Sequence, residues 1–233
     1  GVKKEHAFNI YRGSGSNGKS ILTDLMSQCL GDYKGTVPIT LVTDARGKIG
    51  GTSDEVLKLK GVRYAVMQEP SKNVKLNEGI MKELTGGDPI QARGIYSESE
   101  IFIPQFKLAV GTNNLFDIDS NDDGTWRRIR KCTFPSKFVD EGEEHTDDTD
   151  FVFPKDKSLK DRLPELAPVF MSMLVKKTFE TNGVVTDCDV VLSASNKYRR
   201  GQDNIAAFVC ERIVKTGNPQ DKIGKRGLTE EFK

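Results

Sequence analysis

Residues 13–20 read Gly13-Ser14-Gly15-Ser16-Asn17-Gly18-Lys19-Ser20, and this octapeptide is the most informative stretch of the chain. A β-prone segment, residues 6–11, enters it, and an apolar helical stripe over residues 19–30 leaves it. In such a strand–loop–helix unit the backbone amides curl around phosphate oxygens and the helix N-terminus adds its positive end. We therefore predict that all eight residues form a phosphate-binding loop, with a glycine-rich helix cap as the alternative.

Within this loop, Lys19 and Ser20 have separate expected roles. Lys19 is expected to neutralise the β- and γ-phosphate oxygens of ATP, and Ser20 to offer its hydroxyl to Mg²⁺. A GTPase is disfavoured, because the guanine-reading pattern Asn-Lys-x-Asp is absent: Asn196-Lys197-Tyr198 is followed by Arg199.

A second predicted strand, residues 62–67, ends in Gln68-Glu69-Pro70. We expect this strand to lie next to the P-loop strand and to place Glu69 where a carboxylate polarises water or holds Mg²⁺. Gln68 is neutral at a position where a first acidic residue is common. An exposed glutamate at a strand end is the alternative for Glu69.

Short apolar segments alternate with helical ones, which predicts an α/β layer with a mostly parallel central sheet. The segment at 86–104 reads as an inserted β-hairpin with its tip at Ser97-Glu98-Ser99.

Residues 140–150 are acidic and predict a solvated loop. Beyond them, residues 163–181 are helix-like but broken by Pro164 and Pro168, and residues 203–213 predict another amphipathic helix. Gly31 is expected to end the first helix in the left-handed conformation.

The composition of the 233-residue chain sets further limits. A hydrophobic fraction of 36% and a charged fraction of 30%, with no apolar run near ~20 residues, argue against a membrane-embedded protein. The four cysteines, scattered and without a Cys-x-x-Cys pair, predict reduced, buried thiols in an intracellular compartment. A net charge of +1 means that any DNA contact must come from local basic positions.

With the P-loop and Glu69 placed, four further stretches follow in a recognisable order: residues 82–88, the hairpin, residues 106–114 and residues 124–130. Together with 195–198 and 203–208, this order resembles the superfamily 3 helicases, closest to the C-terminal ATPase portion of poxvirus-type and phage-type primase-helicases. The resemblance implies an AAA+-like P-loop ATPase core with a helical C-terminal segment.

The resemblance also implies roles for three residues. Asn113 matches the sensor asparagine that hydrogen-bonds the attacking water or the γ-phosphate, with a turn-forming asparagine as the alternative. Arg127 and Arg128 match a Trp-Arg-Arg motif that supplies an arginine finger to the neighbouring subunit's ATP. Spacing to Phe134 favours Arg128, and both are surface cations in the alternative interpretation.

The family's hairpin contacts the DNA backbone in a central channel. Because the tip expected here carries no lysine, Lys82, Arg93 and backbone amides are the candidates for phosphate contact. Tyr96 and Phe102 are expected to pack in the core or within the hairpin rather than to stack on bases.

We therefore expect an ATP-dependent DNA helicase of viral genome replication that hydrolyses Mg-ATP between the subunits of a ring hexamer and acts on single-stranded or forked DNA. Its setting would be inside a host cell, in a cytoplasmic viral factory or the nucleus, with primase and other replication proteins as partners. Expected units are an ATPase core at 1–136, an acidic linker at 137–157 and a helical segment at 158–233 that could begin a further, truncated domain. The alternatives are a packaging motor or loader of another P-loop class and a non-catalytic platform ordered by ATP.

Overall fold

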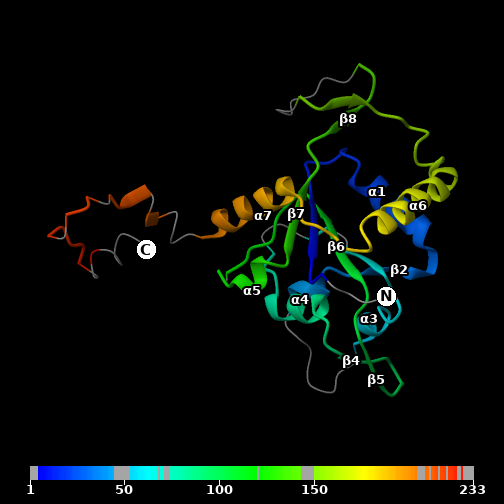
Figure 1. Cartoon of the computed structure of the whole chain (residues 1–233), viewed down its shortest axis with the longest axis horizontal. Coiled ribbons are helices and arrows are strands. Elements are labelled where there is room, and N and C mark those ends of the chain that lie inside the picture. Colours follow the sequence, from blue (N-terminus) through cyan, green and yellow to red (C-terminus); the bar gives the residue numbers. More distant parts are fainter. Residues whose placement is uncertain are drawn as a thin grey trace.

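The computed structural model describes residues 5–44, 53–67, 69–70, 74–119, 121–142 and 150–203, and then 208–209, 211–214, 216–218, 220–224 and 227. Its elements are β1 (Phe8–Arg12), α1 (Lys19–Leu30), the 3-10 turn η1 (Gly31–Tyr33), β2 (Lys34–Val37), α2 (Thr40–Thr43), α3 (Asp54–Leu57), β3 (Tyr64–Met67), α4 (Glu78–Thr85), β4 (Ile90–Arg93), β5 (Ser99–Phe102), β6 (Lys107–Thr112), α5 (Asp123–Trp126), β7 (Ile129–Thr133), β8 (Lys137–Val139), β9 (Val152–Pro154), α6 (Leu163–Glu180) and α7 (Asp189–Gln202). Figure 1 shows their arrangement.

Five strands form the central sheet in the order β2-β3-β6-β1-β7, and every neighbouring pair is parallel. The predicted α/β class with a parallel sheet is confirmed. The prediction that β3 lies next to the P-loop strand is wrong, because β6 separates β3 from β1. Helical crossovers can skip a place in a sheet, so chain order does not fix which strands are neighbours.

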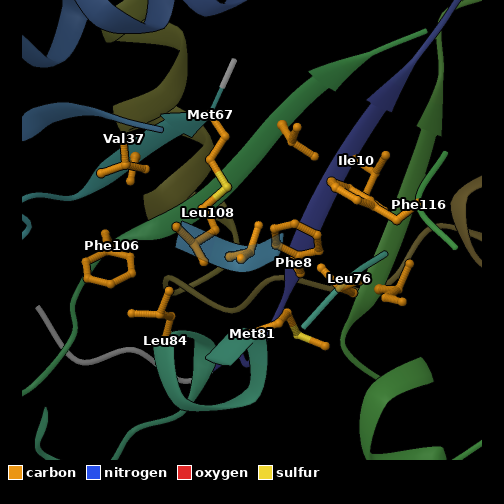
Figure 2. Packing of buried hydrophobic residues seen from close by; sticks show 14 of the residues in the cluster. Phe8, Ile10, Val37, Met67, Leu76, Met81, Leu84, Phe106, Leu108 and Phe116 are labelled. Carbon is orange, nitrogen blue, oxygen red and sulfur yellow. The ribbon is translucent and has the colours of Figure 1, made fainter. Parts of the chain in front are cut away.

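One face of the sheet carries the main hydrophobic core. Strand register places Phe8 and Ile10 of β1 level with apolar residues of β6, so alternate side chains share this face. Met81 and Leu84 of α4 close over it, and both are almost fully buried. Figure 2 shows Met81 and Leu84 next to Phe8 and Leu108 of the sheet layer. This packing buries β1 and β6, and the P-loop and Asn113 follow directly from these two strands.

The helix predicted for 19–30 is confirmed as α1, and α6 packs against it (Figure 1). The thiol of Cys29 donates to the carbonyl of Ala167 at 3.1 Å. Gly31 ends α1 with φ 52° and ψ −125°, which is a positive φ but not the predicted left-handed helical conformation.

Helix α6 runs without a break from Leu163 to Glu180, so the expected interruption by two prolines is wrong. Pro164 stands in the first turn, where a backbone amide has no intrahelical acceptor to lose. Pro168 lies inside the helix and the helix continues past it.

Helix α7 was not predicted as such, and it covers the outer edge of β7. The backbone amide of Lys131 donates to Ser195 Oγ at 2.9 Å, which satisfies a group on the open edge. Tyr198 is buried, donates its hydroxyl to the carbonyl of Phe116 and meets Trp126 edge to face with ring centroids 5.2 Å apart. Helices α6 and α7 therefore pack on the same core as the central sheet, and the expected range 137–157 holds the short parallel pair β8–β9. The exact unit boundaries stay a prediction.

Strands β4 and β5 pair antiparallel, which confirms the hairpin. Arg93 pairs with Ser99, so the connecting turn comprises residues 94–98 and Ser99 belongs to β5 rather than to the tip. Gln68, residues 143–149 of the acidic stretch, and residues 204–207 and 210 of the helix expected at 203–213 lie outside the described residues. Of that expected helix, residues 208–209 and 211–212 are described and are helical.

Cys29, Cys132 and Cys188 are free thiols, while Cys210 lies outside the described residues. Cys29 and Cys132 are half-buried, but Cys188 is exposed, contrary to the expectation of buried thiols. In the described part of the chain, no helix combines the length and the apolar character that a membrane crossing requires.

Candidate nucleotide site

The P-loop joins β1 to α1 at the carboxyl edge of the sheet. Gly15 and Gly18 have φ angles of 103° and 86°, and Ser16 has φ 43°. Such angles are readily adopted by glycine and cost a serine some strain. A Cβ added to Gly13 would overlap Asn17 Nδ2 and lie 2.9 Å from the carbonyl oxygen of Phe134. The glycines are therefore required by backbone geometry and by close packing.

The loop is held from both sides of β1. The amide of Gly13 donates to the carbonyl of Thr112 on β6 at 3.2 Å, and the carbonyl of Ser16 accepts from the amide of Phe138 on β8 at 2.7 Å. The backbone amides of Gly15 and Ser16 meet no acceptor in the described part of the chain. Donors fixed in this way suit phosphate oxygens.

Asn17 adds a further donor to the loop. Its side chain is 5% exposed, and its Nδ2 atom is buried without a partner among the described residues. A buried, unpaired donor is costly, and a bound anion or water would satisfy it. The described P-loop thus fits a phosphate group.

Lys19 lies at the centre of the site. Its Nζ donates to the carbonyl of Gly13 at 2.8 Å and to Asn113 Oδ1 at 2.9 Å. Partial burial lowers the pKa of Lys19, with Arg12 acting in the same direction and Glu69 opposing it. A cation that is already partly desolvated gains strongly from an incoming phosphate.

Glu69 and Asn113 are brought together although 44 positions separate them in the chain. The backbone amide of Asn113 donates to Glu69 Oε1 at 2.7 Å, and Asn113 Nδ2 lies 3.3 Å from Oε2. Asn113 therefore bridges Glu69 and Lys19. Since β6 lies between β1 and β3, the asparagine that follows β6 stands between the lysine after β1 and the glutamate after β3.

Thr112 was not predicted to contribute to the site. Its side chain is fully buried, its hydroxyl accepts from the amide of Asn114 at 3.0 Å, and it also donates to the carbonyl of Asn114. These bonds fix the turn that carries Asn113. The sequence offered no distinct signal for this role, because a threonine at the end of a strand is common.

Ser20 lies in the first turn of α1 and is exposed, so its hydroxyl is open to an incoming ion. No group of three metal-ligating side chains occurs among the described residues. Mg²⁺ in nucleotide sites needs only one or two protein ligands, because phosphate oxygens and waters complete its shell. Ser20 and Glu69 match this requirement.

Arg127 and Arg128 lie far from the P-loop of their own chain. Arg128 precedes β7, and its carbonyl accepts from the amide of Phe8, the first residue of β1, at 2.7 Å. Both arginines are therefore at the amino edge of the sheet, roughly 16 Å (five residues at about 3.3 Å) from the carboxyl edge. Neither can complete the nucleotide site of the same chain.

The two arginines differ in their surroundings. Arg128 is half-buried, its Nη1 donates to the carbonyl of Gly124 at 2.5 Å, and its Nε is buried without a partner among the described residues. Burial and the charge of Arg127 lower the pKa of Arg128, which Asp122 partly offsets. Arg127 is exposed, and its guanidinium has no partner within the described part of the chain.

The candidate DNA contacts also lie away from the P-loop. Lys82 Nζ forms an ion pair with Asp122 Oδ2 at 2.5 Å, which lowers the carboxyl pKa to about 2. Arg93 is exposed at the base of the hairpin turn and its Nε donates to the carbonyl of Ser97 at 3.2 Å. Lys82 is therefore paired with Asp122, whereas the Arg93 guanidinium lies at the turn of the hairpin.

The hairpin turn differs from expectation at its aromatic residue. Tyr96 is fully exposed with φ 58°, so the prediction that it packs inside is wrong. Phe102 is half-buried and packs against the core, as expected. The two aromatic residues differ because Phe102 lies in the paired strand β5, whereas Tyr96 lies in the five-residue turn outside the strand pairing.

Comparison with known proteins confirms the resemblance to proteins of large DNA viruses. The chain is 34% identical over 240 residues to "Putative helicase L207/L206" of Acanthamoeba polyphaga mimivirus, covering 100% of this chain and 25% of that protein. It is 30% identical over 223 residues to "Putative primase C962R" of African swine fever virus (strain Badajoz 1971 Vero-adapted), covering 91% of this chain and 23% of that protein. It is 31% identical over 213 residues to "Putative helicase 022R" of Frog virus 3, covering 88% of this chain and 22% of that protein. The chain thus spans about a quarter of the length of these relatives.

Among solved structures, the fold is similar to the C-terminal region of NrS-1, residues 305–718. The TM-score is 0.54 at 12% identity, over 92% of this chain and 52% of that one. At this identity the likeness concerns the fold. No known family profile matches the chain.

Proposed function

We propose that this chain is the ATPase core of an ATP-dependent DNA helicase of superfamily 3, with an AAA+-like fold, that acts in viral genome replication. The observation that carries the proposal is the joining of Lys19, Asn113 and Glu69 at one edge of the sheet. The names of the viral relatives support a replication role.

In this proposal the loop residues 13–20 bind ATP, and Lys19 moves from its protein acceptors to the β- and γ-phosphates. Glu69 polarises the attacking water, and Asn113, already bonded to Glu69, orients it. Ser20 and Glu69 would hold Mg²⁺, which supplies charge neutralisation at the phosphates. Because Asn113 contacts both Lys19 and Glu69, binding of a terminal phosphate at Lys19 would change the hydrogen bonding of the Glu69 carboxylate that activates water.

The separation of the two edges of the sheet supports assembly into a ring. The nucleotide site lies at the carboxyl edge and the arginines at the amino edge, so an arginine finger can act only on a neighbouring copy. A closed ring of head-to-tail contacts, a hexamer, provides every site with a finger. The exposed Arg127 is better placed to reach a neighbour than the half-buried Arg128 that spacing favours.

The hairpin lies on the side of the sheet away from the P-loop (Figure 1). In the proposal, Arg93 and the hairpin backbone contact the phosphates of single-stranded or forked DNA, with Lys82 joining only if its ion pair with Asp122 opens. Primase and other replication proteins are the proposed partners, inside an infected host cell.

The test is steady-state phosphate release together with strand displacement on forked DNA. Lys19→Ala should lose both activities, because no other cation in the loop can replace its phosphate contacts. Lys176→Ala, an exposed lysine on α6, is the matched control and should retain both. Normal turnover of Lys19→Ala would refute the P-loop assignment.

The same assay separates the alternatives. A packaging motor or loader would release phosphate without displacing a strand. A non-catalytic platform would bind ATP and release no phosphate.

A further inference from the structure

The chain that follows β7 closes one side of the P-loop. The amide of Phe134 donates to the carbonyl of Arg12 at 2.8 Å, and the amide of Phe138 to the carbonyl of Ser16 at 2.7 Å. A Cβ placed on Gly18 would lie 3.7 Å from Cε2 of the Phe138 ring. Phe138 is therefore bonded to the loop through its backbone, and its ring lies next to Gly18.

The sheet order gives a direction to any nucleotide bound in the loop. Glu69 and Asn113 follow β3 and β6, which lie on one side of β1, and they mark the end where the terminal phosphate reacts. Strand β7 lies on the other side of β1. A nucleotide whose terminal phosphate faces Glu69 extends its nucleoside toward β7 and the segment after it, where Phe138 lies.

The ring of Phe138 belongs to an aromatic pair. Strands β8 and β9 place Phe138 opposite Phe153, with ring centroids 5.9 Å apart and planes inclined by 34°. Phe138 is half-buried, while Phe153 is 45% exposed. An exposed apolar surface of this kind beside the P-loop is costly in water and suits a flat aromatic ligand.

We propose that Phe138, supported by Phe153, forms the wall against which the base of the bound nucleotide stacks. The inference rests on the nucleotide binding proposed above and adds the residue that recognises the base. A phenyl ring has no hydrogen-bonding group, so this wall favours large purine rings over pyrimidines and does not itself distinguish adenine from guanine.

The experiment measures the dissociation constants of Mg-ADP, Mg-ATP and Mg-tripolyphosphate with the full chain by titration calorimetry. Tripolyphosphate fills the phosphate loop but has no base, so the comparison separates the loop from the wall. In the wild type, ATP should bind at least about 10-fold (~1.4 kcal/mol) more tightly than tripolyphosphate.

Two variants then locate the wall. Phe138→Leu keeps an apolar side chain and the backbone bond to Ser16 but removes the aromatic face, and Phe153→Leu removes the supporting ring. Phe138→Leu should weaken ADP and ATP about 10-fold and leave tripolyphosphate unchanged, with a smaller effect for Phe153→Leu. Phe179→Leu, an exposed phenylalanine on α6, is the matched control and should change neither.

The outcomes distinguish this inference from the proposed function. If wild-type protein binds tripolyphosphate as tightly as ATP, the wall is refuted while the phosphate loop stands. Equal weakening of ATP and tripolyphosphate by Phe138→Leu would show that the ring only supports the loop, which also refutes the wall. If the wild type binds none of the three, both the wall and the proposed function fail.

Discussion

Replacing Arg127 by alanine is expected to abolish ATP hydrolysis while leaving the fold intact. The Arg127 side chain is exposed and has no partner within the described part of the chain. Its removal should therefore change the free energy of unfolding by less than about 0.5 kcal/mol. The loss of an arginine finger typically lowers turnover by about 10³ to 10⁵.

Arg128→Ala is the comparison, because sequence spacing favours Arg128 as the finger. Its Nη1 bond to the carbonyl of Gly124 is a charge-assisted contact, worth about 1.5 to 3 kcal/mol in general, and half-burial reduces this to roughly 1 to 1.5 kcal/mol. For a chain of this length the melting temperature should fall by about 2 to 6 °C. Calorimetric melting and phosphate release therefore separate a structural arginine from a finger.

Subunit mixing completes the test. Arg127→Ala retains its own nucleotide site, and Lys19→Ala retains its own arginine, so mixed rings contain some interfaces in which both halves are intact. Partial hydrolysis should return only in the mixture. Normal turnover by Arg127→Ala alone would refute Arg127 as the finger, and a 10³-fold loss confined to folded Arg128→Ala would assign the role to Arg128. If the two inactive proteins remain inactive after verified exchange, action on a neighbouring subunit is refuted.

Three further predictions follow from individual contacts. Glu69→Gln should bind ATP normally but lose about 10² to 10⁴ in turnover measured by phosphate release, because the amide keeps the shape and removes the base; unchanged turnover would assign the role to another carboxylate. Gly13→Ala should destabilise the fold by about 1 to 3 kcal/mol in urea unfolding and weaken ATP binding, because the new Cβ overlaps Asn17. Gly111→Ala is the control, because its Cβ would meet nothing within 4 Å, and it should bind ATP normally. The Lys82 partner lowers the pKa of Asp122 to about 2, so the contribution of this carboxylate to stability is present above about pH 4 and is lost as the pH falls through 2. In urea unfolding, the wild type should be more stable than Asp122→Asn at pH 6, and the difference should be gone below pH 2. A difference that does not vary with pH would contradict this prediction.

Local patterns in the sequence determined the units of the fold. The eight P-loop residues, the apolar stripe of α1 and the hairpin at 86–104 could be predicted because each depends on neighbours within a few residues. The α/β class followed from the alternation of such units. The resemblance to viral primase-helicases placed Asn113, which no local pattern distinguishes from an ordinary turn residue.

Which of these units meet depends on long-range packing. The place of β6 between β1 and β3 puts Asn113 between Lys19 and Glu69, and chain order does not reveal it, because a crossover helix can carry a strand past its predecessor. The difference between Arg127 and Arg128 is likewise one of burial, set by how α5 packs, although the two residues are adjacent in sequence. The position of Phe138 against the P-loop depends on a contact across 122 residues of chain, and periodicity carries no information at that range. Helices and strands can be predicted because local propensity depends on residues close together in the chain. The site is formed by packing between residues that are far apart in the chain.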